Sequence, residues 1–311
     1  MATITRGARP TSLPMLNDVP TDPIEEHVVL ATDGGLASIS AMRWIADRAR
    51  AHVLDVDVVV VLDEERVLGG IIDGARTKEA GRAVESAADY LGWVAPSVEV
   101  ATSVLAGAPR ATLQRLSASA DLLVVGTNRA GPLSRHLLAT FSTRLAEAAS
   151  CPTVVVPRGW ERSTGPVVVG VAGDSSDDAA LEFAAHEAEV LQRRLVLVHA
   201  WHLRPAINPA FAADQDYESA LAAHGAHLAA AEARVRATHP EIMVTRVLEH
   251  TQAVQALLRA GEGAALLVVG THELTVLDRM LLASVSRGVL ERPPCPVVIV
   301  PPAEEEDGAQ G

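Results

Sequence analysis

Four turns of this sequence contain residues that could bind a small charged molecule. They follow Thr32, Val125, Val171 and Val269, each at the end of a short apolar run, and each turn contains glycine. Glycine lets the backbone approach a ligand closely, and the N–H groups at the start of a following helix favour negative charge. We therefore look for ligand binding, above all of an anion, at these four turns.

No arrangement typical of an enzyme accompanies these turns. The sequence contains no Gly-Lys-Ser/Thr phosphate loop, no nucleophile elbow and no catalytic arrangement of Ser, His and Asp. Asp177 and Asp178 could act as a pair of acids, but we expect them to cap the helix 179–191 and to favour its dipole. The sequence indicates binding rather than catalysis, and we predict no catalytic residue.

Histidines provide the other candidates for chemistry. His224 and His227 lie three residues apart on an expected helix, and His199 and His202 flank the end of an expected strand. No cluster of cysteines or carboxylates accompanies them at the spacing of a metal site. We therefore expect ordinary exposed histidines and no metal ion.

The elements that must position these residues occur twice. Residues 120–157 and 264–301 align without a gap and are identical at about half of their positions, and a repeat of this length indicates a domain rather than a solenoid unit. We expect two copies of one α/β domain in this chain. The expected segments are a disordered N-terminal segment 1–24, a first domain 25–160, a second domain 161–302 and an acidic tail 303–311.

Each copy alternates short apolar runs, typical of buried strands, with apolar residues at helical spacing. The expected strands are 27–32, 56–62, 98–104, 122–125 and 153–156 in the first copy, and 167–171, 195–200, 243–248, 266–269 and 297–300 in the second. This alternation predicts a parallel sheet with right-handed crossovers and helices on both faces. Ligands of such sheets bind outside the carboxyl ends of the strands, which is where the four turns lie.

Composition and charge exclude several classes of partner. The formal net charge is −13 and no stripe of Lys and Arg occurs, which argues against nucleic acid. No secretory signal and no apolar run of about 18 residues is present, so we expect a cytoplasmic protein without membrane contact. Cys151 and Cys295 hold equivalent places in the two copies, and we expect small buried hydrophobic residues rather than a disulfide.

A first strand ending in Asp-Gly, a fourth strand ending in Val-Val-Gly and a closing Cys-Pro-Val-x-Val-x-Pro together resemble the universal stress protein family in its tandem form. The segments that carry the resemblance are ATDGG at 31–35, VVGTNRAG at 124–131, CPTVVVP at 151–157, VVGTHE at 268–273, LLASVS at 281–286 and CPVVIVP at 295–301. The resemblance covers nearly the whole chain from His27 to Pro301. It implies two tandem five-stranded α/β sandwiches of the Rossmann-like, adenine nucleotide alpha hydrolase type, and a non-enzymatic stress-response function.

Nucleotide-binding members of that family carry Gly-x-x-Gly, nine residues, and then Gly followed by Ser or Thr. The first glycine is present in both copies, as Gly126 and Gly270. The second is replaced by Arg129 and Glu273, and the third by Ala139 and Ala283. The final hydroxyls remain as Thr140 and Ser284, with Ser142 and Ser286 two residues later. The phosphate loops have therefore partly diverged from the ATP-binding pattern.

The resemblance implies an adenine nucleotide as ligand, ATP or another, with Mg²⁺ only where ATP is bound. The implied binding residues are Asp33, Gly34, Gly126, Thr127, Arg129, Thr140 and Ser142 in the first copy, and Gly270, Thr271, Ser284 and Ser286 in the second. Arg129 could pair with a phosphate, whereas Glu273 would repel it. Asp33 stands where the family has an acid beside the ribose and metal, and Ala172 replaces it in the second copy. We expect the first copy to be the better site.

Two other functions fit the sequence. With both sites empty, the tandem fold would be a protein-binding scaffold whose long, divergent segments 63–81 and 202–217 select an unidentified protein partner. Slow ATP hydrolysis is a further alternative, for which only the first copy has an acid near the expected metal position.

The last strand of each copy lies at an expected sheet edge, and an uncovered edge favours pairing. The resemblance implies that 153–156 and 297–300 pair across a pseudo-twofold axis and so join the two halves of the chain. A homodimer of the whole chain is compatible with the sequence but is not indicated by it.

Overall fold

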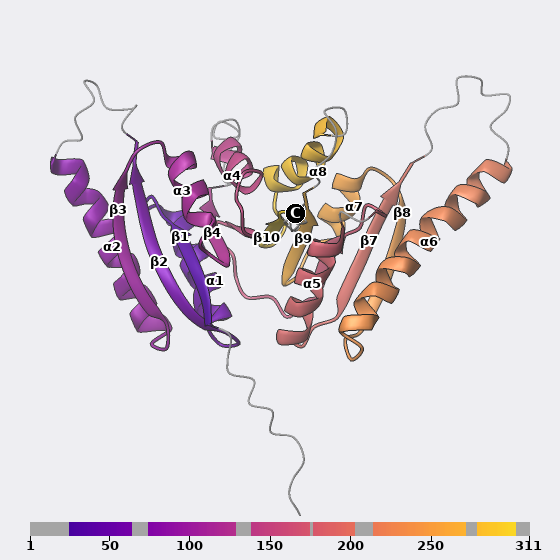
Figure 1. Cartoon of the computed structure of the whole chain (residues 1–311), viewed down its shortest axis with the longest axis horizontal. Coiled ribbons are helices and arrows are strands. Elements are labelled where there is room, and N and C mark those ends of the chain that lie inside the picture. Colours follow the sequence, from indigo (N-terminus) through magenta and orange to yellow (C-terminus); the bar gives the residue numbers. More distant parts are fainter. Residues whose placement is uncertain are drawn as a thin grey trace, which may run out of the picture.

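The computed structural model describes residues 25–63, 74–128, 138–174, 177–202, 214–271 and 279–302. Strands and helices alternate along both halves of the chain (Figure 1). The first half comprises β1 (Glu25–Ala31), α1 (Leu36–Arg48), β2 (Val53–Leu62), α2 (Gly74–Val94), β3 (Glu99–Ala106), α3 (Pro109–Ser117), β4 (Leu122–Thr127), α4 (Leu138–Ala146) and β5 (Thr153–Pro157). The second half comprises β6 (Val167–Gly170), α5 (Asp178–Val190), β7 (Leu195–Trp201), α6 (Asp214–Thr238), β8 (Val244–His250), α7 (Ala253–Ala260), β9 (Leu266–Gly270), α8 (Arg279–Glu291) and β10 (Val297–Val300).

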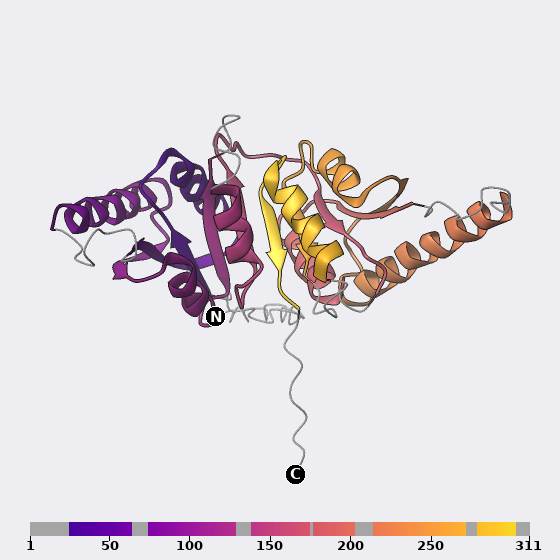
Figure 2. The same ribbon diagram turned by 90° about the horizontal axis from the view of Figure 1, so that it is seen from above.

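The described strands join one continuous sheet in the order β3-β2-β1-β4-β5-β10-β9-β6-β7-β8. Neighbours within each half are parallel, whereas β5 and β10 are antiparallel, with Val154 opposite Val298. Figure 2 shows β10, in yellow, at the centre of the molecule where the halves meet. The predicted parallel sheets and the pairing of the last strands are confirmed, and antiparallel pairing of equivalent strands is what a twofold relation between the halves requires.

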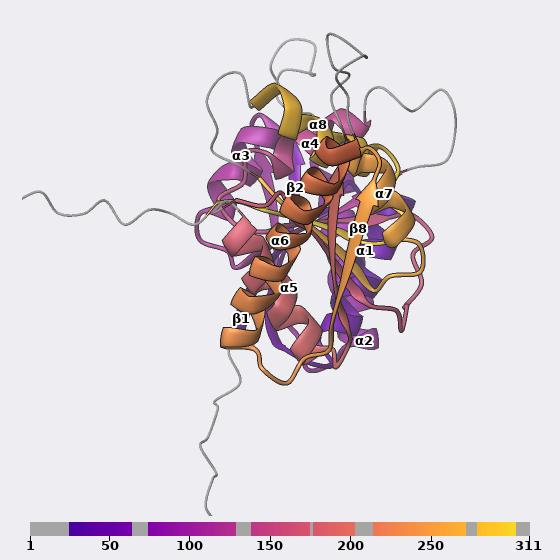
Figure 3. The same cartoon turned by 90° about the vertical axis from the view of Figure 1, so that its right-hand side faces the viewer.

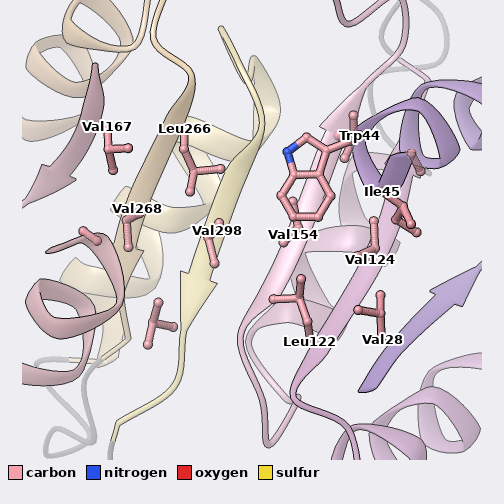
Figure 4. Close-up of a cluster of buried hydrophobic side chains, with 14 of the residues drawn as sticks. Val28, Trp44, Ile45, Leu122, Val124, Val154, Val167, Leu266, Val268 and Val298 are labelled. Atoms are coloured by element: carbon pink, nitrogen blue, oxygen red, sulfur yellow. The ribbon is translucent and has the colours of Figure 1, made fainter. Parts of the chain in front are cut away.

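The sheet is buried on both faces because successive side chains of a strand point to opposite sides. In β4, Leu122 and Val124 belong to the cluster that contains Ile45 of α1, whereas Leu123 and Val125 belong to the cluster that contains Leu145 of α4. Figure 4 shows the first cluster, which extends across the seam into the second half. A continuous apolar run such as LLVV is therefore the sequence that this sheet position requires.

In the described parts of the chain, four helices cover each face of the sheet. Residues of α1, α2, α5 and α6 belong to one hydrophobic cluster, and residues of α3, α4, α7 and α8 to the other. In the end-on view of Figure 3, α6 and α7 lie on opposite sides of β8. Each βα turn at the carboxyl end of a strand is thus fixed between a rigid sheet and a packed helix. Most of the expected partner segments, residues 64–73 and 203–213, lie outside the described residues.

A buried ion pair joins the two halves beside the strand seam. Arg48 of α1 donates to both carboxylate oxygens of Glu187 of α5, at 2.9 and 2.8 Å, and to both oxygens of Glu26, at 2.6 and 2.9 Å. The Arg48 and Glu187 side chains are only 5% and 1% exposed. Burial alone would raise the pKa of Glu187, but the charge and hydrogen bonds of Arg48 outweigh it, so the pKa is lowered. The halves are therefore held by a bidentate charged contact as well as by strand pairing.

Both cysteines are buried free thiols, 5% and 4% exposed, as expected from the sequence. Burial raises the pKa of Cys151 and of Cys295 to about 12, and the thiolate is the reactive form. We predict that Ellman's reagent labels neither thiol in the native protein at pH 8 and labels both after unfolding in guanidinium. Stoichiometric labelling of the native protein within minutes would show that the packing around Cys151 and Cys295 is looser than described.

Candidate functional site

The first candidate site is the turn between β1 and α1, at the carboxyl end of the sheet. The Asp33 carboxylate accepts hydrogen bonds from the Gly35 N–H at 2.8 Å and from the Ser38 hydroxyl at 3.3 Å. The Thr32 hydroxyl donates to Ser38 Oγ at 2.8 Å and accepts from the Gly34 N–H at 3.0 Å. Gly34 has a φ of +73°, in the left-handed region that glycine favours. These bonds fix an exposed carboxylate beside the first turn of α1.

Gly126 brings the end of β4 against that same first turn. A Cβ atom at Gly126 would lie 2.3 Å from the carbonyl oxygen of Ala37, so only glycine fits. The next residue, Thr127, is buried, and its carbonyl accepts the N–H of Arg158 at 3.0 Å. Gly126 thus has a structural role in addition to the one implied by the sequence: it places the β4 turn next to the Asp33 turn.

The remaining predicted residues of the first half lie on or before α4. Ser142 is buried on this helix. Thr140 lies in the first turn of α4, but its side chain is outside the described residues, and so is all of Arg129. The structure therefore brings Asp33, Gly34 and Gly126 together at one sheet edge. The binding roles of Arg129 and Thr140 stay predictions.

In the second half, the turn after β6 is hydrogen-bonded to the carboxylate of Asp177. Asp177 Oδ1 accepts the Ala172 N–H at 2.8 Å and Oδ2 accepts the Gly173 N–H at 2.7 Å, and Asp177 is only 3% exposed. Asp178 forms an ion pair with Arg234 on the outer helix α6. We expected both acids to cap the helix, but in the described part of the chain Asp177 makes no capping hydrogen bond to α5. The capping prediction was wrong for Asp177, because its carboxylate turns back to the N–H groups of the preceding turn.

The other predicted residues of the second half lie near the same edge. Gly270 ends β9, and the Thr271 hydroxyl donates to the Val300 carbonyl at 3.2 Å. Ser286 is buried on α8, and the side chain of Ser284 lies outside the described residues. The Thr271 hydroxyl is therefore already bonded to the backbone of β10.

A cavity of about 210 Å³ opens at this edge of the second half. Its lining is mostly apolar and comes from the ends of β6, β7 and β9 and from α7 and α8. The lining residues are Gly170, Val171, Ala172, Asp177, Val198, His199, Ala200, Ala253, Leu257, Val269, Gly270 and Val285. Ligand pockets are usually larger, at about 300–1,000 Å³. The buried Asp177 makes this cavity unsuitable for a polyphosphate.

Three histidines meet next to the cavity, contrary to our expectation of ordinary exposed side chains. His199 of β7 is 5% exposed, and its Nε2 lies 2.8 Å from Nδ1 of His224 on α6. One nitrogen atom from each of His199, His224 and His227 lies within 4.8 Å of the others. Burial is the main cause that lowers the pKa of His199 and of His224. The spacing of His224 and His227 was visible in the sequence, but no local pattern could place β7 beside them.

Comparison with known proteins agrees with this architecture. The model of the universal stress protein family matches residues 25–157 and 164–301. A universal stress protein of Mycolicibacterium smegmatis is 30% identical over 295 residues, which is 89% of this chain and 98% of that protein. One from Mycobacterium tuberculosis is 28% identical with the same coverage.

A solved structure shares the fold. It is a universal stress protein from Archaeoglobus fulgidus that is 19% identical, with a TM-score of 0.64, covering 90% of this chain and 98% of its own. In the part of the chain that the structure describes, no helix is both long and apolar enough to cross a membrane. The fold of the tandem chain is thus shared with a protein of very different sequence.

Proposed function

The chain belongs to the universal stress protein family, and we propose that it is a non-enzymatic, cytoplasmic stress-response factor that binds an adenine nucleotide in its first domain. ATP, with Mg²⁺, and AMP are the ligands to test first. The family's sequence pattern supports an adenine nucleotide as the ligand. The differences between the two domains support the first domain as its site.

The choice of the first domain rests on the different residues and hydrogen bonds at the starts of α1 and α5. The residues of the first turn of α1 are Leu36, Ala37, Ser38 and Ile39, none of which is acidic, and within the described residues no side chain caps this helix. The turn before α5 has its N–H groups bonded to buried Asp177, and α5 begins with Asp178. Both helix starts have a nearby carboxylate, but Asp33 is exposed and can face a ligand or its metal ion, whereas Asp177 is buried with both oxygens bonded to its own turn. We therefore assign the nucleotide to the first domain.

The proposed contacts follow from the positions around the first turn. The exposed Asp33 carboxylate accepts hydrogen bonds from ribose hydroxyls or holds Mg²⁺ when ATP is bound. Gly126 allows close approach of the backbone, and Arg129, Thr140 and Ser142 supply a charge and hydroxyls for the phosphates. In the second domain Gly270, Thr271, Ser284 and Ser286 form at most a weaker site, since the Thr271 hydroxyl is already bonded to Val300.

The duplication provides a matched control for testing this site. We predict that Thr140→Ala/Ser142→Ala abolishes the stabilisation by nucleotide, whereas Ser284→Ala/Ser286→Ala leaves it intact. Ligand at 100 times Kd stabilises the wild type by about 2.7 kcal/mol, which raises its Tm by several degrees. Thermal unfolding of the three proteins with and without 5 mM Mg-ATP or AMP makes this measurement. Equal loss in both double variants, or loss only in the second, would contradict the assignment to the first domain.

Two further measurements distinguish nucleotide binding from ATP hydrolysis and from a nucleotide-free protein scaffold. Phosphate release from Mg-ATP above the level of the Thr140→Ala variant would show a slow ATPase. Failure of the wild type to gain stability from any adenine nucleotide would favour the nucleotide-free protein scaffold. We propose binding without turnover because the sequence contains no catalytic arrangement of residues, and the described hydrogen bonds of Asp33 go to Gly35 and Ser38.

A further inference from the structure

We propose that His199, His224 and His227 form a binding site for one divalent transition-metal ion, and that zinc is the ion its ligands suit best. The site lies in the second domain, between the end of β7 and the inner face of α6. It is separate from the proposed nucleotide site in the first domain, so the two can be tested independently.

The nitrogen atoms already have nearly the separation that a metal ion requires. Two ligands of a tetrahedral zinc ion, each about 2.0–2.1 Å from the metal, lie about 3.3 Å apart. In this site Nε2 of His199 is 2.8 Å from Nδ1 of His224, and one nitrogen of each of the three rings lies within 4.8 Å of the others. Side-chain adjustments of less than 1.5 Å would bring all three atoms to metal-binding distance. His224 and His227 share a face of α6 because residues three apart on a helix are neighbours.

A backbone carbonyl orients His199 as a metal ligand. The Val171 carbonyl can only accept a hydrogen bond, so Nδ1 of His199, 2.7 Å away, donates to it. In the neutral ring Nε2 then carries no proton and presents its lone pair toward His224. A hydrogen bond from the other ring nitrogen to a carbonyl is the usual way in which a protein fixes the tautomer of a metal-binding histidine. The His224 Nδ1 proton fills the place of the metal in the metal-free protein, and metal binding moves this proton to the other nitrogen of the ring.

His227 has a buried nitrogen that the described residues leave without a partner. Its Nδ1 is inaccessible to solvent and forms no hydrogen bond within the described part of the chain. Such a nitrogen normally requires an explanation, and an ion between the three rings would provide one. Gly173 packs directly on this ring: with a φ of +103°, it is at a position where a Cβ would lie 2.5 Å from Nδ1. The turn 171–173 therefore holds two of the three histidines.

The charges around the site favour a cation. The buried Asp177 carboxylate is bonded to the same turn, through Ala172 and Gly173. Its charge acts on His199, although it is not a ligand. Three imidazoles without a thiolate suit Zn²⁺, Ni²⁺ or Cu²⁺, whereas Mg²⁺ and Ca²⁺ prefer oxygen ligands. Three protein ligands leave a fourth position for water or a further ligand, as in open zinc sites.

Calorimetric titration of the untagged, EDTA-treated full chain with ZnSO₄ tests the proposal. The wild type should bind one zinc ion per chain, and His224→Gln and His227→Gln should each weaken binding at least 10-fold. The control is His186→Gln, which removes an exposed histidine of the adjacent helix α5 and should leave zinc affinity unchanged. Mg²⁺ should produce no binding heat at the same concentrations.

The same proteins supply a second measurement that does not depend on affinity alone. Co²⁺ bound by three histidines should give a visible absorption spectrum that the His227→Gln protein lacks while its circular dichroism spectrum is unchanged. The proposal is overturned if the folded wild type binds no zinc, or if His224→Gln and His227→Gln bind it as tightly as His186→Gln. Without added zinc, the rise in Tm caused by AMP or Mg-ATP should be the same in the wild type and in His227→Gln. The zinc proposal and the nucleotide proposal can therefore fail independently of each other.

Discussion

The Arg48→Ala variant is expected to lose about 3–5 kcal/mol of unfolding free energy, because it leaves a buried carboxylate without its partner. Glu187 is 1% exposed and accepts two hydrogen bonds from Arg48. A typical domain is stable by about 5–15 kcal/mol, so this loss removes a large part of the total. It should also weaken the association of the two domains, since Arg48 and Glu187 come from opposite sides of the seam (Figure 1).

Urea unfolding followed by circular dichroism measures this loss, and the chain offers two controls. Arg50→Ala removes an arginine whose side chain is 66% exposed and lies 3.6 Å from Asp47, and its effect should stay below about 1 kcal/mol. Arg48→Met/Glu187→Leu removes both charges of the most buried pair, leaves only the more exposed Glu26 without Arg48, and should be more stable than Arg48→Ala. An Arg48→Ala variant as stable as Arg50→Ala would show that the buried pair does not join the domains.

The same comparison should depend on pH in a defined direction. The pKa of Glu187 lies below its ordinary value of 4.5 in the folded protein. The stabilisation by the ion pair is therefore complete above about pH 4.5 and is lost as the pH falls through the lower folded pKa. Without Arg48, burial raises the pKa of Glu187, so the variant regains stability as this carboxyl takes up a proton. The difference in unfolding free energy between wild type and Arg48→Ala should therefore be largest near pH 8 and should shrink steadily as the pH falls.

Gly126→Ala is expected to destabilise the protein by about 3 kcal/mol, at the upper end of the usual cost of overpacking. The added methyl group would lie 2.3 Å from the Ala37 carbonyl oxygen and 2.5 Å from its carbon. Both are backbone atoms, so the end of β4 must move away from α1. Because Asp33 and Gly126 are held together by this contact, the variant should also lose nucleotide affinity.

Gly92→Ala is the matched control for this substitution. Gly92 lies in α2, and a Cβ there has no described atom within 4 Å. Alanine favours a helix over glycine by about 1 kcal/mol, so this variant should be slightly more stable than wild type. Urea unfolding should therefore give changes of opposite sign for the two glycines. A Gly126→Ala protein with wild-type stability would mean that β4 and α1 are farther apart than described.

The sheet could be predicted from the sequence because the residues that determine its strands are local. A run such as Leu122–Val125 is apolar at every position since both faces of the sheet are covered, and the repeated Cys-Pro before β5 and β10 marks the start of each last strand. The positions of the four turns followed from the alternation of strands and helices. The sequence alone also showed that Ala172 replaces Asp33 in the second copy, because the two copies can be aligned.

The contacts that sequence analysis missed join distant parts of the chain. Arg48 and Glu187 are 139 residues apart, and nothing near either residue indicates a buried charge. His199 reaches His224 and His227 only because α6 packs on β7. Asp177 was misassigned because the residues around it match a helix cap, while its true partners are the N–H groups of the turn before it.

Mass spectrometry of the small molecules released by denaturing the purified protein, after incubation with Mg-ATP and removal of the free ligand, tests the central claim most directly. We predict about one adenine nucleotide per chain for the wild type and for Ser284→Ala/Ser286→Ala, and none for Thr140→Ala/Ser142→Ala. No released nucleotide from the wild type, or two per chain, would contradict the assignment of a single nucleotide site to the first domain.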